Sequence, residues 1–333
     1  MTKRASRNTL YTNDNLYVLC GMNSESVDLI YLDPPFNSKR MYSAPVGSRA
    51  AGASFKDMWT WQDVDKYYLD SLADNFPALA KYIASVGHVH SRPMMAYLTY
   101  MAQRVIEMHR VLKSTGSIYL HCDPTAGHYL KSLLDCVFGK NNFRNEIVWC
   151  YTGGTDTKKS WQKKHDTIFF YTKTNHYLLN PCYVPFNTNT IKRFNKTDED
   201  GRKFKINTLI DGKVTKTYMK EHGKLAPDYW SFPIVNKTSK EGTGYPTQKP
   251  LALLKRIVLA SSNEGDIVMD PFCGCATTCV AAQQLQRKWI GIDIEKQAVS
   301  ILIQRLSEAG RLFRDFVAID QVPKRSDLTE VQP

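Results

Sequence analysis

Residues 265–294 constrain the fold of this chain more strongly than any other stretch. Their composition predicts an apolar strand, a loop of small residues, a helix and a second strand, namely Gly265–Asp270, Pro271–Thr278, Cys279–Leu285 and Trp289–Ile294. An acid, Asp293, lies at the end of the second strand. This order is typical of the first unit of a doubly wound, mostly parallel, Rossmann-like sheet. The chain is therefore predicted to belong to the α/β class.

The loop in this unit contains one glycine, Gly274, and lacks the G-x-G-x-x-G pattern that cradles a pyrophosphate. A nucleoside cofactor without a pyrophosphate therefore fits the loop better. In such a site Asp293 is expected to accept hydrogen bonds from the ribose hydroxyl groups.

A second motif follows the apolar run Val27–Leu32, which predicts a buried strand. The strand must end at Asp33-Pro34-Pro35-Phe36, because proline cannot continue it. These residue types suit the binding of a planar amine: Asp33 and the Pro34 carbonyl accept N–H groups, and Phe36 offers a face to an unstacked base. The simpler alternative is a strand followed by an Asp-Pro turn.

The chain has 333 residues, enough for one large α/β domain with an insertion, and a net charge of +12. Residues 151–245 carry 17 Lys and Arg against 9 Asp and Glu, an excess of 8 positive charges. In this region lysines alternate with aromatic residues, as a nucleic-acid surface requires. A well-hydrated basic surface is the alternative.

The expected organisation has four parts. Residues 1–150 form the first part of the core with a mobile loop at 37–54, and 151–245 form a recognition region. Residues 246–320 complete the core and 321–333 form a polar tail. Apolar spacing further predicts a helix at 93–113 ended by Thr115-Gly116. A strand at 117–122 and a second helix at 127–138 are expected to follow it.

Neither a membrane span nor an export signal is apparent, so a cytoplasmic location with reduced cysteines is expected. No metal site is expected either. The spacing of Cys273, Cys275 and Cys279 is too cramped for an ordinary zinc knuckle, and His88-x-His90 has no third ligand nearby.

Three motifs together resemble a known family. Asp33-Pro34-Pro35-Phe36 resembles the D-P-P-Y/F catalytic motif of S-adenosylmethionine-dependent DNA amino-methyltransferases, and Asp270–Thr278 resembles their D-P-F-x-G-x-G-T-T cofactor loop. Thr247-Gln248-Lys249-Pro250 is similar to the T-x-K-P element before that loop. The order, with the catalytic motif first and the cofactor loop last, is that of the permuted β group. Residues 117–131 and 143–149 also resemble its adenine-specific members.

This resemblance implies a methyl transfer from S-adenosylmethionine to the N6 amine of a flipped adenine in double-stranded DNA. It implies catalytic roles for Asp33, Pro34, Pro35 and Phe36. It leaves open a homodimer and a cognate restriction endonuclease as partners. The implied cofactor residues are Asp14, Thr247, Gln248, Lys249, Asp270, Phe272, Cys273, Gly274, Cys275 and Asp293, and the candidate DNA-binding residues are Lys39, Arg40, Lys163, Lys164, Arg202 and Lys203.

The last loop glycine of the family is replaced by Ala276. Alanine fits a helical backbone without strain but is strained where φ is positive. A cytosine-N4 methyltransferase, a non-catalytic DNA-binding subunit and an RNA methyltransferase are the alternatives to adenine-N6 chemistry on DNA.

Overall fold

The computed structural model describes residues 8–37, 40–45, 47–51, 54–60, 62, 64, 66–152, 157–236, 239–308 and 316–327. The chain forms two compact units. The larger, here called the sheet unit, comprises Met1–Leu179 and Asp228–Pro333. The other, here called the small unit, comprises Asn180–Pro227.

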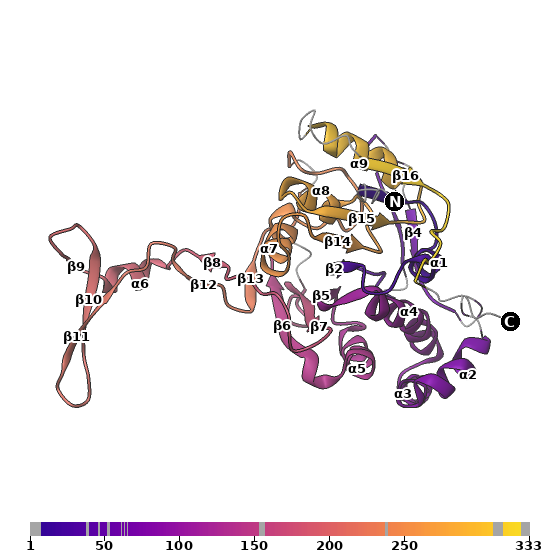
Figure 1. Cartoon of the computed structure of the whole chain (residues 1–333), viewed down its shortest axis with the longest axis horizontal. Coiled ribbons are helices and arrows are strands. Elements are labelled where there is room, and N and C mark those ends of the chain that lie inside the picture. Colours follow the sequence, from indigo (N-terminus) through magenta and orange to yellow (C-terminus); the bar gives the residue numbers. More distant parts are fainter. Residues whose placement is uncertain are drawn as a thin grey trace. The chain divides into compact units, whose positions relative to one another are not determined.

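A nine-stranded sheet runs through the sheet unit in the order β13-β6-β7-β5-β2-β14-β15-β1-β16 (Figure 1). All neighbouring strands are parallel except that β7 is antiparallel to both β5 and β6. The sheet is therefore mostly parallel, as the sequence predicts. The strands are β1 (Asn8–Tyr11), β2 (Val27–Leu32), β5 (Leu112–Cys122), β6 (Phe143–Cys150), β7 (His165–Thr172), β13 (Tyr229–Ser231), β14 (Ile267–Asp270), β15 (Lys288–Ile292) and β16 (Phe316–Ile319).

Helices cover both faces of the sheet (Figure 1). One face carries α1 (Asn15–Gly21), α3 (Pro77–Val89), α4 (Arg92–Val111) and α5 (Gly127–Phe138), with α2 (Lys66–Asn75) packed on α3. The other carries α7 (Leu251–Ser261), α8 (Thr277–Gln284) and α9 (Gln297–Glu308).

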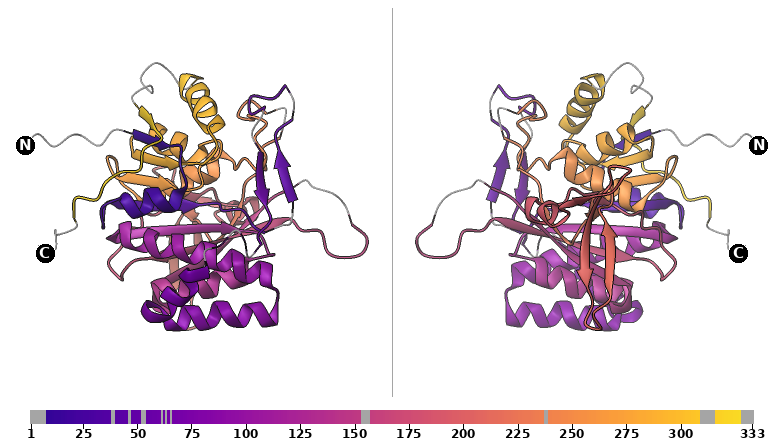
Figure 2. Two further views of the ribbon diagram at one scale, coloured as in Figure 1. Left: turned by 90° about the vertical axis from the view of Figure 1, so that its right-hand side faces the viewer. Right: turned by 90° about the vertical axis from the view of Figure 1, so that its left-hand side faces the viewer.

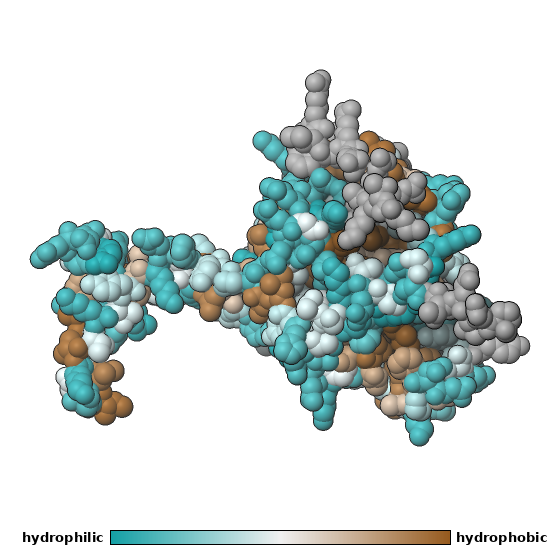
Figure 3. Space-filling view, viewed as in Figure 1, coloured by the Kyte–Doolittle hydropathy of each residue, from teal (hydrophilic) through white to brown (hydrophobic). Residues whose placement is uncertain are grey.

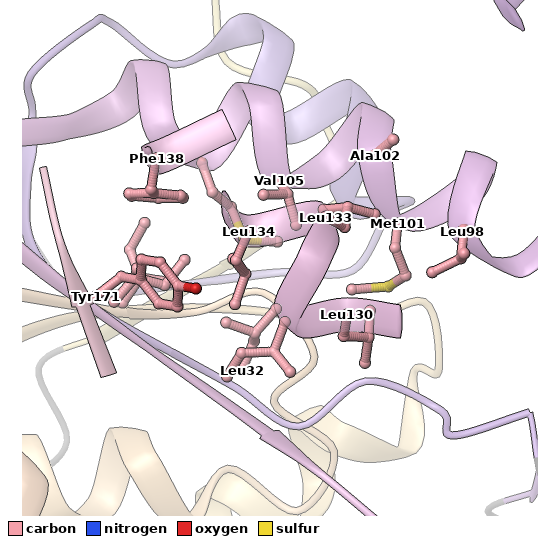
Figure 4. Packing of buried hydrophobic residues seen from close by; sticks show 14 of the residues in the cluster. Leu32, Leu98, Met101, Ala102, Val105, Leu130, Leu133, Leu134, Phe138 and Tyr171 are labelled. Atoms are coloured by element: carbon pink, nitrogen blue, oxygen red, sulfur yellow. The ribbon is translucent and has the colours of Figure 1, made fainter. Parts of the chain in front are cut away.

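Strand β2 shows why the central strands are mostly apolar; its one charged residue, Asp28, is half-buried and paired with Lys113. Ile30 and Leu32 pack into the core beneath α4 and α5, whereas Leu29 and Tyr31 pack into the core beneath α7 and α8. Successive side chains of a strand point to opposite faces, so a strand covered on both faces buries side chains on both of them. Figure 4 shows Leu32 packed among leucine, methionine and valine side chains of α4 and α5.

Two expectations from the sequence were wrong. Helix α4 ends at Val111, not at Thr115-Gly116, because the fully buried Leu112 already pairs with Val27 in the sheet. Part of the segment expected to be a mobile loop forms an antiparallel hairpin, β3 (Arg40–Ser43) with β4 (Ser54–Asp57). Its alternating polar and small residues gave little sign of strand pairing.

The small unit contains short elements only. A three-stranded sheet has the order β11-β10-β9, and β12 pairs with β8. The unit carries 10 Lys and Arg against 5 Asp and Glu, and its surface in Figure 3 is mostly hydrophilic. Its elements are β8 (Tyr183–Val184), α6 (Thr188–Arg193), β9 (Lys196–Thr197), β10 (Lys203–Thr208), β11 (Val214–Tyr218) and β12 (Lys224–Leu225).

The small unit lies within the expected recognition region 151–245, whereas β7 and β13 of that region belong to the nine-stranded sheet. None of the helices in the part of the chain that the structure describes is long and apolar enough to cross a membrane.

Candidate functional site

A cavity of about 480 Å³ lies beyond the carboxyl ends of the central parallel strands. This is where ligands bind in open α/β sheets. The motif that follows β2, the loop that follows β14 and the acid that follows β15 all line it. Every residue predicted from the sequence to be catalytic or to hold the cofactor is among the lining residues: Asp14, Asp33, Pro34, Pro35, Phe36, Thr247, Gln248, Lys249, Asp270, Phe272, Cys273, Gly274, Cys275 and Asp293.

The Asp33 carboxylate has two different environments. Its Oδ2 accepts a hydrogen bond from Lys249 Nζ, and the two side chains form an ion pair that is 16% and 9% exposed, respectively. Its Oδ1 is buried and has no hydrogen-bond partner among the described residues. The resemblance assigned Lys249 to the cofactor, but here its ammonium group contacts Asp33. One carboxylate oxygen is thus fixed while the other remains available as an acceptor.

The Phe36 ring lies against His121, with the ring centroids 6.2 Å apart and the planes inclined by 30°. His121 is fully buried, and both of its ring nitrogens are hydrogen-bonded. Tyr31 Oη lies 2.8 Å from Nδ1, and Asp166 Oδ2 lies 3.1 Å from Nε2. The Tyr151 hydroxyl donates to Asp166 Oδ1 at 3.1 Å. These residues form a hydrogen-bonded chain across β2, β5 and β7 and on to Tyr151, directly behind Phe36.

Asp166, which belongs to these hydrogen-bonded residues, is a half-buried carboxylate. Burial by itself raises the pKa of Asp166, but the hydrogen bond and charge of His121, the Lys249 charge and the Tyr151 hydrogen bond together outweigh burial and hold that pKa below its usual value. This set of hydrogen bonds was not predicted from the sequence, although His121 and Asp166 are polar residues within the apolar strands β5 and β7.

The loop after β14 is held by two acids. Asp270 accepts hydrogen bonds from the backbone N–H of Phe272 and from the Thr278 hydroxyl, so its carboxylate shapes the loop. Asp293 accepts from the backbone N–H of Gly274 at 2.7 Å and of Glu295 at 2.8 Å. A carboxylate has about four acceptor sites, so Asp293 can still accept from the hydroxyl groups of a ligand.

Burial has a large effect on both acids. It raises the pKa of Asp270 to about 7, despite the hydrogen bonds from Thr278 and Phe272, which oppose the shift. It raises the pKa of Asp293 to about 6, again against its two backbone hydrogen bonds. The carboxyl groups of Asp270 and Asp293 therefore change protonation close to neutral pH.

Three non-glycine residues around the cavity have left-handed backbones. Asn37, Thr247 and Ala276 have φ values of 60°, 64° and 59°. Asparagine adopts this region readily, whereas a β-branched threonine there is a genuine outlier. Ala276 therefore occupies a strained position that the family glycine would fill without strain. Strained backbone of this kind clusters at functional sites.

Several contributors to the site were missed. Arg104 of α4 forms an ion pair with Asp14 at 2.9 Å and donates from Nε to Asn15 Oδ1 at 2.6 Å, and the Asn15 amide donates to the Pro271 carbonyl at 2.7 Å. The signal was an arginine within the apolar stripe of a helix. Asp57 of β4 accepts from the backbone N–H of Asn37, and so fixes the chain just after the catalytic motif.

Gln248 and the three cysteines also have structural contacts. The Gln248 amide accepts from Thr243 and donates to the Glu241 carbonyl, so it closes the loop that precedes α7. Hydrogen bonding to Cys279 and burial raise the pKa of the Cys273 thiol, and burial raises that of Cys275. Among the described side chains no cluster of three or more His, Cys, Asp or Glu is arranged to hold a metal ion.

The cations predicted to bind DNA belong to both units of the chain. Lys39 lies outside the described residues, and only the backbone of Arg40, in β3, is described. Lys163 and Lys164 precede β7 in the sheet unit, whereas Arg202 and Lys203 belong to the small unit. Arg202 is paired with Asp198 and Asp200, each at 2.9 Å, which neutralises much of its charge locally.

The small unit instead has a basic groove of about 330 Å³. The groove is lined by the cations Arg193, Lys205, Lys220 and Lys224 and by the rings of Phe186, Phe194 and Tyr218. The described structure shows no ion pair for any of these four cations.

Comparisons with known proteins show the family of the chain. A family model described as "DNA methylase" matches residues 27–304. The chain is 29% identical over 332 residues to the DNA adenine methyltransferase YhdJ of Escherichia coli K12, covering 98% of this chain and 93% of that protein. It is 32% identical over 236 residues to the type II methyltransferase M.HpaI of Haemophilus parainfluenzae, covering 70% and 67% of the two chains.

Among solved structures, the PvuII DNA methyltransferase, described as cytosine-N4-specific, shares the fold. Its TM-score is 0.53 at 12% identity, over 96% of this chain and 97% of that chain. Because the family model spans well over half of the sequence, this chain belongs to the N6/N4 family of DNA methylases, which use S-adenosylmethionine as the methyl donor.

Proposed function

We propose that this protein methylates the N6 amine of an adenine that is flipped out of duplex DNA. The observation that carries the proposal is the buried, unpartnered Asp33 Oδ1 at the wall of the cavity that also contains the cofactor loop. An acceptor at this position suits an exocyclic amine, whose N–H groups need partners once the base has left its pair.

The chemistry required of the protein is alignment and charge stabilisation. An amine conjugated to a purine ring is a poor nucleophile, and acceptors at its N–H groups help its lone pair to localise. S-adenosylmethionine supplies a methyl carbon that its sulfonium activates. With the cofactor bound, the methyl carbon would pass from its sulfur to the amine nitrogen, leaving a neutral thioether, and the proton released from the nitrogen would pass to solvent. Asp33 Oδ1 and the Pro34 carbonyl accept the two N–H groups, and Phe36 holds the base plane in line.

The residues around the rest of the cavity fit the cofactor. Asp293 has acceptor capacity left for the ribose hydroxyls, and Phe272 and Gly274 border the same space. Asp14 follows the carboxyl end of β1 at the same edge of the sheet, with its carboxylate held by Arg104. We assign Asp14, Thr247, Phe272, Gly274 and Asp293 to cofactor contacts.

Asp270, Gln248 and the cysteines are assigned to the architecture of the loops that surround the cofactor, because their polar groups are used within the protein. We assign Lys249 to the positioning of the Asp33 carboxylate, with which it forms an ion pair.

Adenine is favoured over cytosine by the D-P-P sequence and by the relative named a DNA adenine methyltransferase, which aligns over nearly the whole chain. The rival is cytosine N4, the specificity that the PvuII structure carries in its name. Incubating DNA with the enzyme and cofactor, digesting it to nucleosides and weighing them separates the two. N6-methyladenine is expected, and N4-methylcytosine alone would refute the assignment.

We further propose that the basic groove of the small unit, together with Lys203, contacts DNA phosphates. The charges of Arg193, Lys205, Lys220 and Lys224 are available, unlike that of Arg202. Removing a single phosphate-binding cation should reduce the slope of log affinity against log salt by about 0.9. Replacing Lys205, Lys220 and Lys224 by Gln should therefore lower this slope by about 2–3.

The matched control replaces Lys196, Lys213 and Lys216 by Gln; these lysines lie in the same unit outside the groove lining. An equal change of slope in both triple variants would show that the charge of the unit matters and not the groove. M.HpaI is named a type II methyltransferase, so we include a cognate restriction endonuclease and a homodimer among the partners to test, by co-purification and by sedimentation.

A further inference from the structure

The segment 157–164 precedes β7 in the connection from β6 and carries an unusual combination of side chains. Trp161 is 96% exposed, the most exposed of the described tryptophans. Lys158, Lys159 and Lys163 are exposed on either side of it. The neck of the segment is closed by a hydrogen bond from the Tyr151 N–H to the Lys164 carbonyl, 3.0 Å long.

The direction of the strands places this segment at the catalytic edge of the sheet. Strand β7 is antiparallel to both β5 and β6, and β2 is parallel to β5, so β6 and β2 run in the same direction. The chain therefore leaves β6 at the edge where Asp33 follows β2. Figure 2 shows the segment projecting beyond β6 and β7 on the side of the β3–β4 hairpin.

The neck is also joined to the site. Tyr151 and Asp166, which flank the segment, are hydrogen-bonded to each other and through His121 reach the back of Phe36. The two ends of the segment are therefore anchored to the same hydrogen-bonded residues that support Phe36 of the catalytic motif.

A solvent-exposed tryptophan is informative because its ring normally contributes a large buried area. Its neighbours determine the kind of surface that covers it. Cations on both sides of an aromatic ring match a polyanion with stackable bases, since each base offers a π face and each phosphate a negative charge. An apolar protein surface would leave these cations desolvated without partners.

We propose that the segment 157–164 is a DNA-contacting element in which Trp161 stacks on a base next to the target site while Lys158, Lys159 and Lys163 neutralise phosphates. It rests on duplex DNA being the substrate and not on which amine is methylated. The Trp161 ring stabilises the protein–DNA complex in which the target base is flipped out. Its stacking on the neighbouring base replaces the base stacking that is lost when the target base leaves the duplex.

The first test uses the fluorescence of Trp161. Trp149, Trp230 and Trp289 are buried and Trp59 is half-buried, so among the described tryptophans iodide should quench mainly Trp161. Saturating duplex DNA should lower the iodide quenching constant of the wild type, and this DNA-dependent decrease should be absent in Trp161→Phe. A quenching constant that DNA leaves unchanged would overturn the proposal.

The second test measures affinity. Trp161→Ala should weaken DNA binding by about 5- to 150-fold, the usual effect of removing one base–aromatic stack, with cofactor affinity unchanged. Trp161→Phe should recover part of this affinity, because a smaller ring still stacks. Tyr17→Ala on α1, another exposed aromatic outside the cavity lining, is the control and should bind like the wild type.

Three further outcomes would overturn the proposal. One is DNA affinity of Trp161→Ala within twofold of the wild type. Another is an equal loss of affinity of Trp161→Ala for heparin, which has charge but no bases. The third is tighter binding to anionic vesicles than to DNA that depends on Trp161, which would assign the segment to a membrane. A wild-type enzyme that methylates no DNA would instead refute the function.

Discussion

The ion pair between Asp33 and Lys249 makes a sharp prediction about the catalytic acid. The sequence alone suggests that Asp33→Ala would leave the fold nearly intact, since a site acid is not a core residue. In the structure the variant would strand an ammonium group whose side chain is 9% exposed. Breaking such a pair from one side costs about 3 kcal/mol, which corresponds to about 4 °C in melting temperature for a chain of 333 residues.

The double variant Asp33→Ala/Lys249→Met should behave differently. Replacing both members of a buried pair by apolar groups is close to neutral, so the double variant should regain most of the stability that the single variant lacks. Its methyl-transfer rate should stay low, by about 10²–10³-fold, because the acceptor is still missing. Comparison of the single and double variants thus separates the effect of Asp33 on stability from its effect on methyl transfer.

The assays are thermal unfolding without ligands and single-turnover methyl transfer with saturating cofactor and DNA. Equal stability of the single and double variants would show that the pair contributes nothing in solution. A double variant that transfers methyl groups near the wild-type rate would refute the role of Asp33 itself, whatever the stability data show.

Further predictions concern the cofactor loop and the floor of the site. Because burial raises the pKa of Asp293 to about 6, its carboxylate is ionised only above that pH, and cofactor affinity measured by calorimetry should fall as pH drops from 7 to 5. Asp293→Asn should bind more weakly by about 1–3 kcal/mol and lose this pH dependence. A raised carboxyl pKa also means that this group's contribution to folding stability declines as pH rises from about 4 through 6; a pH-independent difference in unfolding free energy between wild type and Asp293→Asn would contradict this. The melting temperature of Ala276→Gly should lie within a few degrees of the wild-type value. Glycine relieves the left-handed strain, about 1–2 kcal/mol, but it also removes a buried methyl group and raises the entropy of the unfolded chain. Ala276→Val should instead melt clearly lower, because a β-branched side chain is a genuine outlier at positive φ; equal melting of the two variants would argue against a left-handed backbone there. Tyr31→Phe should slow single-turnover transfer by about tenfold or more by loosening His121 behind Phe36, with cofactor affinity unchanged. Tyr119→Phe, which removes from the neighbouring strand β5 a buried hydroxyl bonded to Ser261 of α7, is its control and should retain the rate.

The sequence predicted the architecture well where the signal is local. The strands before Asp33 and Asp293 and the loop around Gly274 follow from apolar runs that end at an aspartate, and all three meet at one cavity. The helix at Gly127–Phe138 was likewise predicted to the residue. These features depend on the residues within a few positions of each other, which is what periodicity and turn chemistry report.

Other features depend on which strands become neighbours. Leu112 leaves helix α4 for the sheet because Val27, 85 positions earlier, pairs with it. The β3–β4 hairpin, and the Asp57 contact that fixes Asn37, arise from pairing in a segment with weak strand character. Pairing over long distances overrides local propensity, so the sequence alone did not place these elements.

The sequence by itself determined the fold class, the three motifs and their order along the chain, because each is written in a short run of residues with its own chemistry. Only the tertiary structure decided that Lys249 engages Asp33, that Ala276 is left-handed, and that Tyr31, His121 and Asp166 form one chain behind Phe36. The physical reason is that a hydrogen bond or an ion pair is set by the approach of side chains from separate strands, and that approach is a property of the whole packed sheet.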